Sequence, residues 1–191
     1  MIVEPLWTIK QRRKLPAPSA WVVRFAPLIV PASEVLDVAA GGGRHVCLLR
    51  RLHHQVLAID RNLSSLMSRA GNDPGLELLV TDLEDGTGWP LANRAFAGVV
   101  VTNYLYRPIL NAIVDSLDEN GVLIYETFAV GNETYGRPHN PDFLLKPGEL
   151  LELALQHGLQ VIAYEHGVDD TKNGVPRVFQ RICAVRVKAV L

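Results

Sequence analysis

The sequence predicts a doubly wound α/β fold, with a mostly parallel seven-stranded sheet, helices on both faces and an antiparallel final strand. From residue 33 onward, short apolar runs alternate with segments whose apolar residues recur at helical spacing. The last two strand-like runs follow one another directly, and the Asn173-Gly174 pair between them favours a hairpin turn. With 191 residues and no visible linker, we expect one domain, with an arm and helix over 1–32 and the α/β core over 33–191.

The first half of the chain reads as a helix followed by alternating strands and helices. Between Pro18 and Pro31 the apolar residues recur at helical spacing, which predicts a short helix there. The alternation then predicts strand EVLDVA (34–39), helix RHVCLLRRL (44–52), strand QVLAID (55–60), helix NLSSLMSRA (62–70) and strand LELLVTD (76–82). Gly71 and Pro74 stop the second of these helices, because neither residue continues a helix well.

The second half continues the alternation and then ends in two adjacent strands. It predicts strand FAGVVVTN (96–103), helix PILNAIVDSL (108–117), strand GVLIYETF (121–128), helix PGELLELALQHG (147–158) and strands LQVIAYEHGV (159–168) and RVFQRICAVRV (177–187). Pro147 near the start and Gly158 at the end of the last helix are the residues that helix ends prefer. A polar segment longer than roughly a dozen residues separates this helix from the strand before it, and such loops are usually functional.

Composition limits the classes of partner. The formal charge of −1 argues against duplex DNA or an anionic membrane as the partner. The basic run Lys10 to Lys14 fits either a nucleic-acid patch or a solvated arm, and the lack of interleaved aromatic residues favours the arm. Cys47 and Cys183 are only two cysteines, widely separated in the sequence, and do not indicate a disulfide framework. The histidines are too scattered in the sequence to indicate a metal site. Without a signal-peptide pattern, a cytoplasmic protein is expected.

The turn after the first strand has the pattern D-x-A-x-G-x-G, formed by Asp37, Ala39, Gly41 and Gly43. A dinucleotide site would need a third glycine where Val46 stands, and a phosphate-binding loop would need a Gly-Lys-Ser/Thr that is absent. The glycines therefore permit close approach to bare backbone without the usual equipment for a pyrophosphate.

Two further acids end the next two strands. Asp60 stands where a carboxylate accepts hydrogen bonds from both ribose hydroxyls, and Asp82 stands where one accepts from an adenine amine. With Asp37 available to an ammonium, directly or through water, the trio predicts an adenosine that carries an amino acid. The competing interpretation is that acids at strand ends merely cap helices.

At these residues the chain resembles the class I S-adenosylmethionine-dependent methyltransferases. VLDVAAGGGRH is similar to their first motif, LAID to the ribose-binding acid, VTDLEDG to the adenine-contacting turn, WPLANRAFAGVVVTNYL to motif four and LDENGVLIYETF to the segment around strand five. The chain departs from the family at Ala39, where a glycine is usual, and at Ala97, where an acid is frequent. The resemblance implies a Rossmann-like core, S-adenosylmethionine as cofactor and a cofactor site formed by Asp37, Ala39, Gly41, Gly43, Asp60, Arg61, Asp82, Leu83 and Thr102.

The methyl acceptor is expected to be a small molecule. The segment TNYLYRP lacks the paired prolines typical of enzymes that methylate nucleobase or glutamine nitrogen. Candidate catalytic residues are His139 as general base, Tyr104 beside the sulfonium and Arg137 as an anion-binding group. Candidate pocket residues are Tyr106, Arg107, Glu126 and Tyr135. The alternatives are an RNA methyltransferase, a non-catalytic adenosyl-cofactor-binding protein and a nicotinamide-dependent oxidoreductase, the last disfavoured by the missing third glycine.

Overall fold

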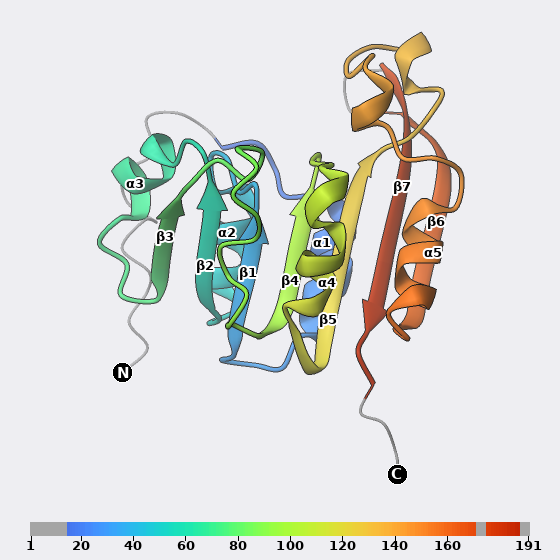
Figure 1. The fold of residues 1–191 in the computed structure, drawn as a ribbon. Helices are drawn as coiled ribbons and strands as arrows, with labels where there is room; N and C mark the ends of the chain where they lie inside the picture. The colour runs from blue at the N-terminus through green and yellow to red at the C-terminus, as the bar shows by residue number, and fades with distance from the viewer. Residues whose placement is uncertain (1–14, 171–174, 188–191) are drawn as a thin grey trace.

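The computed structural model describes residues 15–170 and 175–187, and these residues contain a seven-stranded sheet (Figure 1). The strands are β1 Glu34–Val38, β2 Gln55–Asp60, β3 Leu76–Val80, β4 Phe96–Thr102, β5 Leu117–Phe128, β6 Gln160–Asp170 and β7 Pro176–Val185. Their order is β3-β2-β1-β4-β5-β7-β6. All pairs from β3 to β5 are parallel, and β7 is antiparallel to both of its neighbours. The predicted sheet is confirmed; the Asn173-Gly174 turn and the basic run 10–14 lie outside the described residues.

The strand order places a switch point at the centre of the sheet. From β1 the chain continues to β2 and β3 on one side, and then crosses to β4 on the other side of β1. In open sheets of this kind, ligands bind beyond the carboxyl ends of the strands, at the point where the order reverses. The region beyond the ends of β1 and β4 is therefore where a site is expected.

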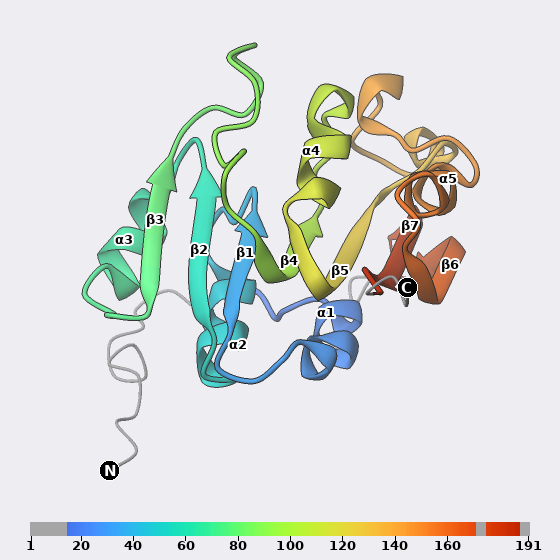
Figure 2. The same cartoon turned by 60° about the horizontal axis from the view of Figure 1, so that its bottom comes forward.

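Helices cover both faces of the sheet, as Figures 1 and 2 show. The helices α1 Ala20–Phe25, α2 Arg44–Arg51 and α3 Ser64–Ala70 pack on one face, where their apolar residues form one core cluster with Val35, Val56 and Val100. The helices α4 Leu110–Asp115 and α5 Glu149–Gln156 pack on the other face, around Leu36, Val99 and Tyr125. Successive residues of a strand point to opposite faces, so each buried strand contributes to both clusters.

The boundaries differ from the prediction where side chains or glycine conformations set them. Helix α3 begins at Ser64 rather than at residue 62, because the Asn62 side chain accepts a hydrogen bond from the Ser64 amide (3.1 Å). Helix α5 begins at Glu149, after Gly148 in a left-handed conformation (φ 79°). Strand β5 begins at Leu117, before the predicted start at residue 121.

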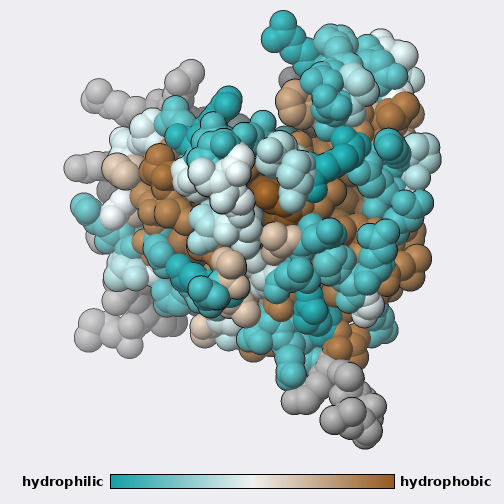
Figure 3. Space-filling model, in the orientation of Figure 1, coloured by the Kyte–Doolittle hydropathy of each residue, from teal (hydrophilic) through white to brown (hydrophobic). Residues whose placement is uncertain are grey.

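The segment between β5 and α5, residues 129–148 and called the lid segment below, projects beyond the sheet. It contains the short 3-10 helices η4 Asn132–Thr134 and η5 Pro141–Phe143, and it returns through a bridge between Ala129 and Leu145. The buried Asn132 anchors it, since its side chain accepts from the Val178 amide (3.2 Å). Figure 3 shows the segment as a mostly hydrophilic projection at the upper right. Within the described residues, no helix is long and apolar enough to span a membrane.

Candidate active site

The glycine turn after β1 has three left-handed residues in alternation. Ala39 (φ 54°), Gly41 (φ 54°) and Gly43 (φ 81°) all have positive φ angles. Glycine adopts this conformation without steric cost, whereas at Ala39 the β-carbon makes it costly. At Gly43 a β-carbon would also lie 2.5 Å from Cδ1 of Leu66, so only glycine fits the start of α2 as it is packed. Close packing as well as ligand access therefore explains the glycine pattern.

A first cavity lies beyond β2 and β3 and has a volume of about 240 Å³. We call it the β2–β3 cavity; it is lined by Ala39, Asp60, Arg61, Thr81, Asp82, Leu83, Glu84, Tyr104 and Phe143. Asp60 accepts hydrogen bonds from the amides of Gly41 (2.9 Å) and Asn62 (2.8 Å), which ties the glycine turn to the end of β2. Asp82 accepts from the Glu84 amide through Oδ1 (3.0 Å). Backbone amides thus orient each carboxylate, and each carboxylate can still accept further hydrogen bonds.

A second cavity of about 260 Å³ lies over the glycine turn itself. This glycine-turn cavity is lined by Leu15, Pro16, Ala39, Ala40, Gly41, Gly42, Arg44, His45, Thr102 and Asn103. The Arg44 guanidinium donates one long hydrogen bond to Oγ1 of Thr102 (3.5 Å), and burial is the largest cause lowering its pKa. A partly buried cation at the start of α2 suits an anionic group such as a carboxylate.

His45 fixes the orientation of the Thr102 hydroxyl at the edge of this cavity. Its Nε2 accepts a hydrogen bond from the Ser19 amide (3.1 Å), and its Nδ1 lies 3.3 Å from Oγ1 of Thr102. Burial lowers the pKa of His45 to about 3, so the ring is neutral. A neutral ring that accepts at Nε2 carries its proton on Nδ1, which therefore donates to Thr102. The Thr102 hydroxyl keeps its own proton for a third partner.

Asp37 lies beneath the glycine turn, 1% exposed, and lines none of the three cavities. Its Oδ2 has no hydrogen-bond partner. Burial raises the pKa of this carboxyl group to about 7, while the Arg44 charge acts in the opposite direction. A buried, unpaired oxygen of this kind binds a cation or a donor more readily than it stays alone.

A third cavity, of about 420 Å³, lies between the ends of β4 and β5 and the lid segment. This lid cavity is lined by Glu84, Asn103, Tyr104, Leu105, Thr127, Phe128, Arg137, Pro138 and Phe143. Glu84, Tyr104 and Phe143 line it together with the β2–β3 cavity, and Asn103 lines it together with the glycine-turn cavity. The three cavities therefore meet beyond the ends of β1 and β4, at the switch point of the sheet.

Known proteins resemble this chain in sequence and in fold. No family model matches the chain. A curated relative, the protein-L-isoaspartate O-methyltransferase of Cronobacter sakazakii, is 30% identical over 116 residues, which cover 59% of this chain and 54% of the relative. The chain thus spans about half the length of the curated relative that it matches.

Solved structures match over most of the chain. TehB from Haemophilus influenzae has a TM-score of 0.70 at 20% identity, covering 87% of this chain and 61% of TehB. A SAM-dependent methyltransferase from Methanosarcina mazei has a TM-score of 0.65 at 14% identity, covering 91% of this chain and 100% of its own. This chain has the class I S-adenosylmethionine-dependent methyltransferase fold.

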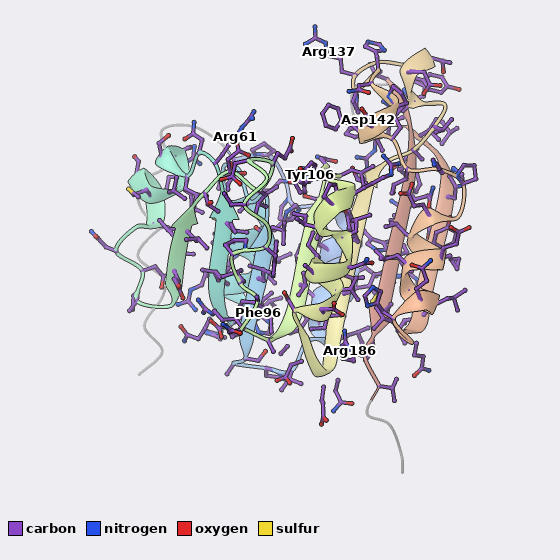
Figure 4. The ribbon with its side chains drawn as sticks, viewed as in Figure 1. Arg61, Phe96, Tyr106, Arg137, Asp142 and Arg186 are labelled. Atoms are coloured by element: carbon purple, nitrogen blue, oxygen red, sulfur yellow. The ribbon has the colours of Figure 1, made fainter. Side chains whose placement is uncertain are left out.

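Within this methyltransferase fold, most of the predicted cofactor residues lie together. Asp60, Arg61, Asp82 and Leu83 line the β2–β3 cavity, Gly41 and Thr102 line the glycine-turn cavity, and Ala39 lines both. Asp37 and Gly43 lie behind them, as the buried acid and the start of α2. Figure 4 shows Arg61 and Tyr106 at the same edge of the sheet.

The residues predicted for catalysis and the acceptor pocket are more dispersed. Tyr104 lies where two cavities meet, and Arg137 lines the lid cavity from the outer end of the lid segment (Figure 4). His139 is exposed, lies near the Glu133 carbonyl (Nδ1 to O, 3.2 Å) and lines none of the three cavities, so its role as a base stays a prediction. Tyr135 is exposed and Tyr106 packs against the core.

Two predicted pocket residues are occupied by protein partners. Arg107 binds Glu149 and two carbonyl groups of the lid segment. Glu126 is 1% exposed, accepts from the Ser19 hydroxyl (3.1 Å) and lies 3.5 Å from the guanidinium groups of Arg177 and Arg181. Neither residue lines any of the three cavities, and each charge has oppositely charged partners within the fold. Their role in an acceptor pocket therefore stays a prediction.

Sequence reasoning missed Arg44, His45, Glu84, Asn103 and Phe143. Arg44 and His45 follow the third glycine directly, so their position at the start of α2 was a usable signal. Asn103 directly follows β4 in a left-handed conformation (φ 55°), which asparagine tolerates better than most residues. Nothing local marks Phe143, because it reaches the site through the return of the lid segment.

Proposed function

We propose that the chain is an S-adenosylmethionine-dependent methyltransferase that acts on a small-molecule acceptor by in-line displacement. The observation that carries this proposal is the meeting of three cavities at one point. Two of them, joined at Ala39, suit the two halves of an adenosyl amino acid, and the third opens beside both. An in-line transfer needs a nucleophile held opposite the leaving sulfur, with water excluded.

The β2–β3 cavity would hold the adenosine. Asp60 would accept from the ribose hydroxyls with the lone pairs that the Gly41 and Asn62 amides leave free. Asp82, fixed by the Glu84 amide, would accept from the exocyclic amine of adenine, with the Leu83 backbone beside it.

The glycine-turn cavity would hold the methionine moiety. Arg44 would pair with its carboxylate, and the Thr102 hydroxyl, oriented by His45, would donate a hydrogen bond. Asp37 would act on the ammonium group from below, directly or through water. When bound, the sulfonium supplies an electrophilic methyl group, and the lid cavity would hold the acceptor.

A binding experiment tests the cofactor. We expect micromolar binding of S-adenosylmethionine and S-adenosylhomocysteine, and none of NADH, by isothermal titration calorimetry. Asp82→Asn keeps the oxygen that accepts from the Glu84 amide but replaces the other carboxylate oxygen, Oδ2, by an NH2 group. This donor would face the amine of adenine, which is also a donor. Losing a hydrogen bond to a charged group should weaken binding about tenfold to a hundredfold.

The chain offers a matched control for this variant. Asp85 accepts from Thr87 in an equivalent turn (2.8 Å) and lines none of the three cavities. Asp85→Asn should therefore leave the affinity unchanged. If neither adenosyl compound binds to the wild-type protein, the methyltransferase proposal is wrong.

The curated relative suggests a second acceptor class, the carboxylate of a protein isoaspartyl residue. Arg137, on the lid cavity, could pair with an acidic acceptor. Methylation of an isoaspartyl peptide, with loss of the product on Arg137→Gln, would favour this class over a free small molecule.

A further inference from the structure

We propose that the lid cavity selects an acceptor with an aromatic body, and that Phe143, held by Arg107, is its outer wall. This inference rests on the proposed methyltransferase function and names the substrate class of the same site. Three features of the described residues carry it: a clamp that fixes Phe143, the exposure of its ring, and a buried hydroxyl group without a partner.

Arg107 clamps both neighbours of Phe143. Its Nη1 donates to the carbonyl oxygen of Asp142 (2.8 Å), and its Nη2 donates to that of Leu144 (2.8 Å). The same guanidinium forms a bidentate pair with Glu149, at 2.7 Å from Nε to Oε1 and 2.9 Å from Nη2 to Oε2. Because Glu149 begins α5, the clamp ties the lid segment to a helix and to the loop after β4 at once.

The segment around Phe143 is also braced internally. Asn140 accepts from the Asp142 amide through its side chain (3.0 Å) and from the Phe143 amide through its carbonyl (3.0 Å). These bonds fix the backbone on both sides of Phe143, from which the phenyl ring extends. Arg107 is therefore a positioning residue that acts through Phe143 and itself lines none of the three cavities.

Phe143 is 41% exposed although its backbone is fixed. It lines the lid cavity together with two other aromatic residues, Tyr104 and Phe128, and Leu105 and Pro138 complete the apolar part of the wall. Aromatic pairs in offset or edge-on contact are favoured beyond the area that they bury. A flat ring bound in this cavity of about 420 Å³ would find three aromatic side chains among the residues that line it.

Tyr104 supplies a polar group at the inner end of the cavity. Its hydroxyl oxygen is buried and has no hydrogen-bond partner of good geometry, although the Glu84 carboxylate is near enough to contribute, after burial, to a raised pKa. The Tyr125 hydroxyl fixes the Tyr104 backbone by donating a hydrogen bond to the Tyr104 carbonyl oxygen (2.9 Å). A heteroatom on the acceptor would satisfy the Tyr104 hydroxyl at the point where the cavities meet.

The test uses two neutral probes of similar size on the protein saturated with S-adenosylhomocysteine. Benzyl alcohol and cyclohexylmethanol carry the same hydroxymethyl group, and the saturated ring is the more hydrophobic. We expect benzyl alcohol to bind about threefold to tenfold more tightly by NMR titration, since hydrophobicity alone predicts the reverse order.

Three variants locate the preference. Phe143→Leu keeps an apolar side chain and should abolish the preference, and Arg107→Gln should reduce it by releasing the ring. Val130→Ala removes another exposed apolar side chain of the lid segment, outside the three cavities, and should leave it intact. Since Phe143 is exposed, Phe143→Leu should stay folded and decides the question even if Arg107→Gln does not fold.

Equal binding of the two alcohols, or tighter binding of cyclohexylmethanol, overturns the inference. If S-adenosylhomocysteine binds in the same experiment, the proposed function is unaffected. A preference that survives Phe143→Leu also overturns it. Failure of S-adenosylhomocysteine itself to bind is a separate result, which removes the proposed function and the inference together.

Discussion

Asp37→Asn is expected to stabilise the unliganded protein at neutral and alkaline pH. Burial raises the pKa of the Asp37 carboxyl group from 3.8 to about 7. The native state therefore keeps a proton that the unfolded state has lost between these two pH values, so the free energy of unfolding falls as the pH rises through this window. Asparagine has the same shape and no charge to bury.

The size of the effect follows from the difference between the two pKa values. A difference of about 3 corresponds to ~4 kcal/mol of lost stability above pH 7, as an upper figure for a fully buried group. Urea unfolding of both proteins from about pH 4 to about pH 8 measures it. The wild-type protein should lose stability relative to Asp37→Asn up to about pH 7 and then run parallel to it.

Cofactor binding should reverse this cost. An ammonium group near Asp37 favours the carboxylate, so binding of S-adenosylmethionine below pH 7 should release close to one proton from Asp37. Calorimetry in two buffers with different ionisation enthalpies measures the release, and Asp37→Asn subtracts any contribution of the cofactor itself. Parallel stability profiles, together with equal proton release in both proteins, would refute the reasoning.

The remaining predictions concern single contacts, each measured as a free energy of unfolding in urea. Gly43→Ala should cost about 1–3 kcal/mol, because alanine is strained at φ 81° and its β-carbon meets Leu66, whereas Gly136→Ala has open space and should be near neutral. Tyr125→Phe should cost about 1–2 kcal/mol by leaving the Tyr104 carbonyl oxygen without its donor. Ser19→Ala should cost about 1–2 kcal/mol, since the hydroxyl caps α1 at the Trp21 amide and also donates to Glu126, and Ser19→Thr should recover part of the loss.

The fold and the position of most candidate cofactor residues can be predicted from the sequence, because both depend on local signals. Strands β1, β2 and β4 are rich in buried apolar residues, Asp60 ends β2, and Asp82 lies two residues after the end of β3. The carboxyl ends of parallel strands meet at one edge of the sheet, so the position of such an acid in the chain also gives its position in space. The position of Arg44 near the same edge could have been predicted in this way, because it begins α2 directly after the glycine turn.

Asp37 shows where this local reasoning stops. Its position at the end of β1 indicates nearness to the glycine turn, but the packing of α2 above it decides that it lies beneath the cavities rather than in them. Its unpaired oxygen and its raised pKa follow from that burial. Burial is a property of the assembled layers, and no strand-end rule supplies it.

The acceptor side depends on contacts between segments that are distant in the chain. Arg107 lies in the loop after β4, where position alone suggests a pocket residue, yet its guanidinium binds Glu149, 42 residues further on. The sequence says which edge of the sheet a side chain is near, but the return path of the lid segment decides which way it points. Of the lid segment, Phe143 alone is among the residues that line the β2–β3 and glycine-turn cavities. Changes in residues 140–144 should therefore alter the choice of acceptor while the acids that would bind the cofactor keep their geometry.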